Sequence, residues 1–130
     1  MYKKSITYID YNGNERTETA YFNLSEAELT DWNFSKDGGL AEKLQRIVDS
    51  KNGAEIMETF KQVLKKSYGV KSDDGRQLMK GKKLFKEFSQ TEAYNQLFME
   101  LCTDAKAAAD FINNVIPSND KMKIYNKRDV

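Results

Sequence analysis

The pattern of polar and apolar residues divides the chain into a β-like beginning and a helical remainder. Residues 2–22 alternate polar side chains with β-branched and aromatic ones, and Asn12-Gly13 interrupts them near the middle. Such alternation is typical of strands, and Asn-Gly is the dipeptide that two-residue hairpin turns favour. The pattern therefore predicts a β-hairpin over residues 2–22. A two-residue turn would place Tyr8 opposite Thr17 and Ile6 opposite Thr19, all on one face.

From Ser25 onward the apolar residues recur at helical spacing. Ser25 and Glu28 fit a capping box, the arrangement that begins a helix. Further helices are predicted over residues 40–48, 56–68, 84–88, 89–101 and 104–116, with Gly69 just after one of them and Pro117 ending the last. A second capping box is predicted for Ser89 and Glu92. Residues 70–80 are predicted to form a loop or mobile arm with a turn at Ser72–Gly75. The predicted core includes Phe60, Leu64, Leu97, Phe98 and Phe111.

These elements predict an α+β fold, namely a mainly α-helical single domain with an N-terminal β-hairpin. Strands that come first and helices that follow are expected to segregate in this way. We place the domain at residues 1–117, with the hairpin at 2–22 and helices from about 25 to 116. Residues 118–130 follow the helix-ending proline and are mostly polar, so we expect a flexible tail.

The composition agrees with one globular domain. The chain has 130 residues, of which 32% are charged and 39% apolar, and this length supports one core. It has no apolar run near the roughly 18 residues that span a bilayer, and its N-terminus lacks the apolar stretch of a secretory signal. We therefore expect no membrane association and a location in the cytoplasm. The single cysteine, Cys102, agrees with a reducing compartment.

The charges are distributed unevenly along the chain. Residues 61–86 hold nine Lys or Arg against two Asp, a net charge of +7, whereas the other residues together carry −6. This basic middle can be a solvated face, or it can attract acidic partners or other copies of the chain. Together with the unpaired edge of a lone hairpin, it predicts a homo-oligomer, in the form of a ring or an open spiral. The alternative is a monomer whose edge is covered by a helix or blunted by Lys3 and Lys4.

The sequence carries no recognisable catalytic or metal-binding arrangement. It has no histidine and only one cysteine, so the commonest acid–base group is missing and a zinc site cannot form. It also lacks a glycine-rich phosphate loop, and Asp73-Asp74-Gly75 lacks the later ligands of a calcium loop. Cys102 fits a small buried hydrophobic residue. We therefore expect no enzyme activity and no cofactor.

Two non-enzymatic classes remain, nucleic-acid binding and protein binding. Nucleic-acid binding would use the basic middle, with Tyr68 or Phe85 stacking on bases. The nearly neutral chain has no nucleic-acid fold signature, so we do not expect this class. Protein binding would use apolar helix faces rimmed by charge, although the same aromatic spacing also fits a core. The predicted protein-binding residues are Lys80, Lys82, Lys83, Phe85, Lys86, Phe88 and Tyr94.

Two segments carry a resemblance to a known family. The opening KKSITYIDYNGNERTETAYFNLSEAEL and the later KLFKEFSQTEAYNQLFMELCTDAKAAADFINNVIP resemble the small tail assembly chaperones of long-tailed bacteriophages, especially those of Gram-positive hosts. The resemblance covers most of residues 2–117. It lies in the layout of the chain and not in a catalytic signature. The family has no invariant binding motif, so it assigns no individual site residue here.

The resemblance implies a function in phage tail assembly. Such proteins are largely helical with a small β element, hold the long tape measure protein in solution, and help to recruit tail tube protein. They act in the host cytoplasm and are absent from the finished virion. Many families also make a longer form by ribosomal frameshifting near the end of the short reading frame. The alternative is a small structural or adaptor protein of the phage particle, and the sequence does not separate the two.

Overall fold

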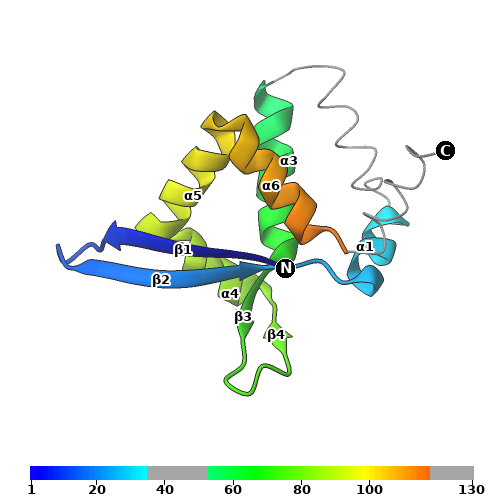
Figure 1. The fold of residues 1–130 in the computed structure, drawn as a ribbon, viewed down its shortest axis with the longest axis horizontal. Helices are drawn as coiled ribbons and strands as arrows, with labels where there is room; N and C mark the ends of the chain where they lie inside the picture. The colour runs from blue at the N-terminus through cyan, green and yellow to red at the C-terminus, as the bar shows by residue number, and fades with distance from the viewer. Residues whose placement is uncertain (35–52, 118–130) are drawn as a thin grey trace.

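The structure is a computed structural model that describes residues 1–34 and 53–117 (Figure 1). Along the chain these residues form β1 (Tyr2–Ile9), β2 (Glu15–Phe22), α1 (Glu26–Asn33), α3 (Gly53–Ser67), β3 (Tyr68–Lys71), β4 (Leu78–Met79), α4 (Lys82–Ser89), α5 (Glu92–Thr103) and α6 (Ala105–Val115). The described part is an α+β fold. The helix predicted at residues 40–48 and the tail predicted at residues 118–130 lie outside the described residues.

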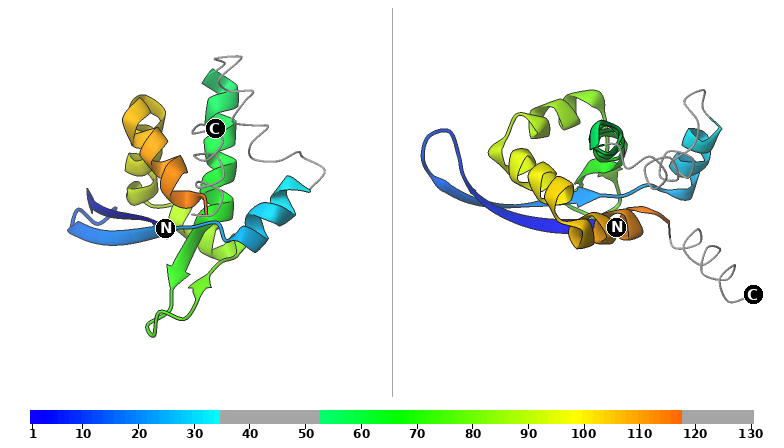
Figure 2. Two further views of the ribbon diagram at one scale, coloured as in Figure 1. Left: turned by 45° about the vertical axis from the view of Figure 1, so that its right-hand side comes forward. Right: turned by 90° about the horizontal axis from the view of Figure 1, so that it is seen from above.

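The strands form one antiparallel sheet in the order β1-β2-β3-β4. In Figure 1, α3, α5 and α6 lie on the same side of the β1–β2 hairpin, and the β3–β4 hairpin points away from α5 and α6. Figure 2 shows α1 beyond the end of β2, on the side away from the hairpin turn. The predicted N-terminal hairpin is thus confirmed, but it is half of a larger sheet.

The prediction of a loop over residues 70–80 is wrong at both ends of this segment. Val70 pairs with Met79 and Lys71 with Leu78, so a second hairpin forms there. Its strands of four and two residues are too short to show a clear alternating pattern. The turn between them is confirmed, because Gly75 has a φ of +75°, which glycine adopts readily.

The predicted register of the first hairpin is wrong by one residue. Asp10 explains the difference, because its carboxylate accepts the N–H groups of Asn12 and Asn14, each at 2.9 Å. The Asp10 N–H also donates to the Asn14 carbonyl at 2.8 Å, which leaves a three-residue loop with Gly13 at a φ of +85°. Ile9 therefore pairs with Glu15.

The shifted register exchanges the predicted faces of β2. Thr17 and Thr19 lie on the solvent face, where their hydroxyls bond to Thr7 at 2.9 Å and to Ser5 at 3.2 Å. The side chains that turn toward the core from this hairpin are Ile6, Tyr8, Ala20 and Phe22, all of them buried.

Most helix predictions are confirmed, with two changed boundaries. The capping box at Ser25 and Glu28 is present. The second predicted capping box is wrong, since the Ser89 hydroxyl donates to a carbonyl within α4 and Thr91 instead caps α5 by accepting the Tyr94 N–H at 3.2 Å. Gly69 is also not a helix end, because α3 passes directly into β3 and Gly69 pairs with Tyr21 of β2.

The core lies between the sheet and the helices. Four of the five predicted core residues are buried there, and Phe98 is half-buried against them. Phe22 is fully buried at the centre, with its ring 5.6 Å from Phe111 and 5.5 Å from Tyr68. Met57 belongs to the predicted apolar stripe of α3, yet it is 44% exposed.

Candidate protein-binding surface

Aromatic side chains from β3, α4 and α5 form a continuous cluster. Tyr68 stacks on Phe88 with ring centres 4.4 Å apart. Phe85 and Phe88 each meet Tyr94 edge-on, at 5.8 and 5.7 Å, and Tyr94 stacks on Phe98 at 5.8 Å. All five rings are half-buried against the core. The cluster is therefore part of the packing and also reaches the surface.

Burial affects the ionisation of the two phenols in this cluster. Desolvation raises the pKa of the Tyr68 and Tyr94 phenols above the ordinary tyrosine value. The shift favours the neutral phenol, which is also the form of an ordinary tyrosine at physiological pH. They can donate a hydrogen bond to a partner while their rings offer it apolar area.

The predicted lysines of α4 are more exposed than its aromatic residues, and Lys83 and Lys86 lie on the side of the helix away from them. Lys82, Lys83 and Lys86 are exposed, whereas Phe85 and Phe88 are half-buried. Helical geometry explains the arrangement: Lys83 and Lys86 are three apart and share one face, Phe85 and Phe88 share another, and Lys82 lies between the two faces. A partner approaching α4 from solvent would meet the lysines first and the edges of the rings second.

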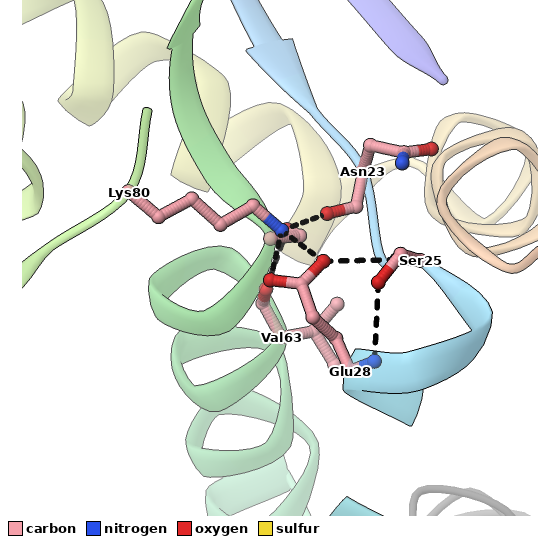
Figure 3. Close-up of polar contacts among 6 residues, drawn as sticks. Asn23, Ser25, Glu28, Val63 and Lys80 are labelled. Carbon is pink, nitrogen blue, oxygen red and sulfur yellow. Dashed lines mark hydrogen bonds and ion pairs between the residues drawn. The ribbon is translucent and has the colours of Figure 1, made fainter. Parts of the chain in front are cut away.

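Lys80 has a different environment from the α4 lysines. Its ammonium group donates to both carboxylate oxygens of Glu28 at 2.7 Å and to the Asn23 carbonyl (Figure 3). Burial alone would raise the pKa of Glu28, but the bonds from Lys80 and the Ser25 N–H outweigh it and the pKa is lowered. Lys80 thus joins the segment between β4 and α4 to α1, and its charge is already paired.

A basic hollow lies where the end of α3 meets the beginning of α4. It has a volume of about 370 Å³, and its lining residues are Gln62, Lys65, Lys66, Gly81 and Lys82. Of these, only Lys82 was among the predicted binding residues. The charge count of residues 61–86 includes all three lysines, but their proximity depends on the β3–β4 hairpin, which the sequence pattern did not reveal.

Exposed methionine side chains occur on α3, β4 and α5. Met57 of α3, Met79 of β4 and Met99 of α5 are 44%, 40% and 57% exposed. Methionine is flexible and adapts to differently shaped partners, so exposed methionines suit a binding surface. Lys61 adds a cation above the Phe98 ring, 6.0 Å from its centre.

Residues 1–34 and 53–117 lack two other kinds of site. This part of the chain contains no group of three or more His, Cys, Asp or Glu side chains that could hold a metal ion. Within the same ranges, no helix has both the length and the apolar character needed to cross a membrane. The surface features described above are those of a contact surface: charge at the rim, partly accessible rings and flexible apolar side chains.

Comparison with known proteins agrees with this description. A family model described as phage tail assembly chaperone matches residues 1–128, which is nearly the whole chain. Comparison with curated proteins and with solved structures gives no match. A match of this extent covers both the sheet and all the described helices. The chain therefore belongs to the phage tail assembly chaperone family.

Proposed function

We propose that this protein binds the tape measure protein of its phage, keeps it soluble, and assists assembly of the tail tube around it. In this proposal it acts in the host cytoplasm without enzymatic activity and is absent from the mature virion. The observation that carries the proposal is the amphipathic helix α4, whose lysines are exposed above a half-buried aromatic cluster, in a member of the tail assembly chaperone family.

The physical requirement on such a chaperone is to cover apolar surface without becoming insoluble. A long helical client has apolar faces that would otherwise associate with one another. Half-buried rings at Phe85, Tyr94 and Phe98 offer apolar area for an amphipathic helix. The neighbouring Lys83 and Lys86 are exposed and keep the surface hydrated.

Coexpression with the tape measure protein tests the proposal. We expect the wild-type chain to raise the soluble fraction of the tape measure protein and to copurify with it. The variant Lys83→Glu/Lys86→Glu should lose much of this effect. The matched control Arg76→Glu/Lys106→Glu changes the same charge at exposed positions of the β3–β4 turn and of α6, and it should retain the solubilising effect. No copurification of the wild-type pair would refute the proposed function.

Analysis of purified virions separates the chaperone from the alternative, a structural or adaptor protein of the particle. A chaperone should be present in infected cells and missing from virions by mass spectrometry. Detection in virions at a fixed ratio to the tail tube protein would favour the structural alternative instead.

We also propose that the protein forms homo-oligomers through β1. This strand is at the end of the sheet order. Asp10 and Asn14 form a hydrogen-bonded pair, and bonded and non-bonded pairs alternate along an antiparallel ladder. The N–H and C=O groups of every second residue of β1, namely Lys3, Ser5, Thr7 and Ile9, therefore point to its outer edge. Such an edge invites pairing with another chain. Sedimentation at tens of micromolar should show species above 15.0 kDa. A single 15.0 kDa species at every concentration and salt level would contradict this.

A further inference from the structure

We propose that the basic hollow between α3 and α4 binds a carboxylate-bearing segment of a partner protein. The residues that line the site are Gln62, Lys65, Lys66, Gly81 and Lys82, so three of the five carry an ammonium group. The identification of this partner as the tape measure protein rests on the proposed function, whereas the chemistry of the site follows from its own residues.

The lining of the hollow has a single sign of charge. Its five residues include three lysines and no Asp or Glu. Lys65 and Lys82 are exposed, and among the described residues neither forms an ion pair. Lys66 is held with its ammonium group 5.1 Å from the centre of the Trp32 ring. The hollow therefore concentrates positive charge that the described part of the chain leaves uncompensated.

The beginning of α4 adds to the same field. Gly81 provides no side-chain cap, and the first turn of the helix contains no acidic residue. The first N–H groups of a helix lack intrahelical acceptors and carry partial positive charge. Gly81 also leaves space, since a methyl group there would meet no atom within 4 Å. A carboxylate entering beside Lys82 would find both an ammonium group and unsatisfied backbone donors.

Long-range contacts hold the two helix ends in place. Lys80 directly precedes Gly81, and its ammonium group is fixed by Glu28 and by the Asn23 carbonyl (Figure 3). On the α3 side of the hollow, the C-terminal end of α3 passes directly into β3, which is paired with β2. The hollow is thus built on paired strands and an ion pair and does not depend on a free loop.

The partner chemistry favours protein over nucleic acid. Single-stranded nucleic acids are usually held by exposed rings that stack on bases beside a basic groove. Here Phe85, Phe88 and Tyr68 stack on or abut one another and are half-buried. None of the residues that line the hollow is aromatic. Carboxylates need only the cations and backbone donors that the hollow supplies.

Fluorescence anisotropy with a labelled peptide of alternating glutamate and alanine tests the site in the full chain. We expect binding that weakens as salt is raised. The variant Lys65→Gln/Lys82→Gln should weaken it about fivefold or more, as expected for two exposed charge contacts. The variant Lys65→Arg/Lys82→Arg should retain it. The control Arg76→Gln/Lys106→Gln removes the same charge at exposed positions of the β3–β4 turn and of α6 and should change binding less than about twofold.

Three results would overturn the inference. One is equal weakening by the hollow and control variants, which would mean that only net charge matters. Another is equal binding of a glutamine–alanine peptide. The third is tighter binding of oligothymidine, lost in the same hollow variant, which would assign the hollow to nucleic acid. Circular dichroism of each variant shows that the fold is intact, and Lys66 is left unchanged to preserve its contact with Trp32.

Coexpression separates a failure of this inference from a failure of the proposed function. If Lys65→Gln/Lys82→Gln loses the peptide but still solubilises the tape measure protein, the chaperone function stands and its client docks elsewhere. If the wild-type chain binds the peptide but does not solubilise the tape measure protein, the hollow stands and another acidic partner must be sought.

Discussion

Gly69 is the position where one added methyl group should disturb both the sheet and its connection to α4. Gly69 is buried in β3, and a Cβ atom built on it would lie 2.4 Å from Cγ of Leu78 and 3.0 Å from both of its Cδ atoms. Real Cβ contacts of this kind do not occur, so Leu78 would have to move. Cγ is the branch point of that side chain, so Gly69→Ala requires either a change of the Leu78 χ1 rotamer or a shift of β4.

The expected cost follows from two opposing effects. Overpacking of a tight site costs about 1–3 kcal/mol. Replacing a strand glycine by alanine regains about 0.5–1 kcal/mol of conformational entropy. The net loss for Gly69→Ala should be about 1–2 kcal/mol. For a chain of 130 residues, that corresponds to a fall of about 4–8 °C in melting temperature.

A double-mutant cycle measured by urea denaturation tests this explanation. Leu78 is half-buried, so Leu78→Ala alone should cost about 1 kcal/mol. The double variant should cost at least about 1 kcal/mol less than the sum of the single variants, because the smaller side chain removes the clash. Gly81→Ala is the control, since its Cβ would meet no atom within 4 Å. Gly81 is the N-cap of α4, so this variant should cost about 0.5–1 kcal/mol, and that cost should be additive with Leu78→Ala.

Two outcomes would refute the reasoning. If Gly69→Ala is within about 0.5 kcal/mol of the wild type, Leu78 does not pack over β3 as described. If the cycle is additive, the cost of the alanine arises from some other contact.

Three further predictions concern the core, the first hairpin and the tail. Phe60 is 8% exposed, with its ring 6.4 Å from that of Phe111, so Phe60→Ala should cost about 3–5 kcal/mol in denaturation, and a loss below about 1 kcal/mol would contradict its core position. The hydrogen bond to Glu18, with burial, raises the pKa of Tyr8 from 10.0 to about 12; its contribution to stability is complete below pH 10.0 and is lost as the pH rises through about 12. Glu18→Gln should therefore lower the pKa of Tyr8 toward 10.0, as followed by tyrosinate absorbance. Deleting residues 118–130 should leave the melting temperature nearly unchanged, whereas a large fall would show that the tail packs into the fold.

The features that sequence reasoning predicted correctly are those determined within a few residues. The capping box at Ser25 and Glu28 is a local arrangement, and the structure contains both of its hydrogen bonds. The hairpin was located correctly by the Asn12-Gly13 turn. Its register was not, because Asp10 is hydrogen-bonded across the turn and selects a longer loop than the dipeptide alone suggests. Local sequence was therefore sufficient to predict the capping box. It also contained the signal for the hairpin register, namely Asp10, but the prediction did not use it.

The features that were missed depend on contacts between distant parts of the chain. β4 has only two residues, and its pairing with β3 stabilises a strand that no periodicity can identify. Lys80 was predicted to be a binding residue, but its pairing with Glu28 links residues 52 positions apart. The binding prediction thus did not distinguish the exposed lysines of α4 from Lys80, which is engaged in the fold.

These long-range contacts also explain why the basic hollow is a defined site and not simply a lysine-rich stretch. A flexible chain with the same charge would bring its lysines together only transiently, because like charges repel one another. Here the pairing of β3 with β2 fixes the end of α3, and the ion pair between Lys80 and Glu28 fixes the approach to α4. The folding energy of the sheet therefore offsets the repulsion between Lys65, Lys66 and Lys82. An acidic partner that neutralises these lysines would relieve the repulsion, so binding at the hollow should also stabilise the fold.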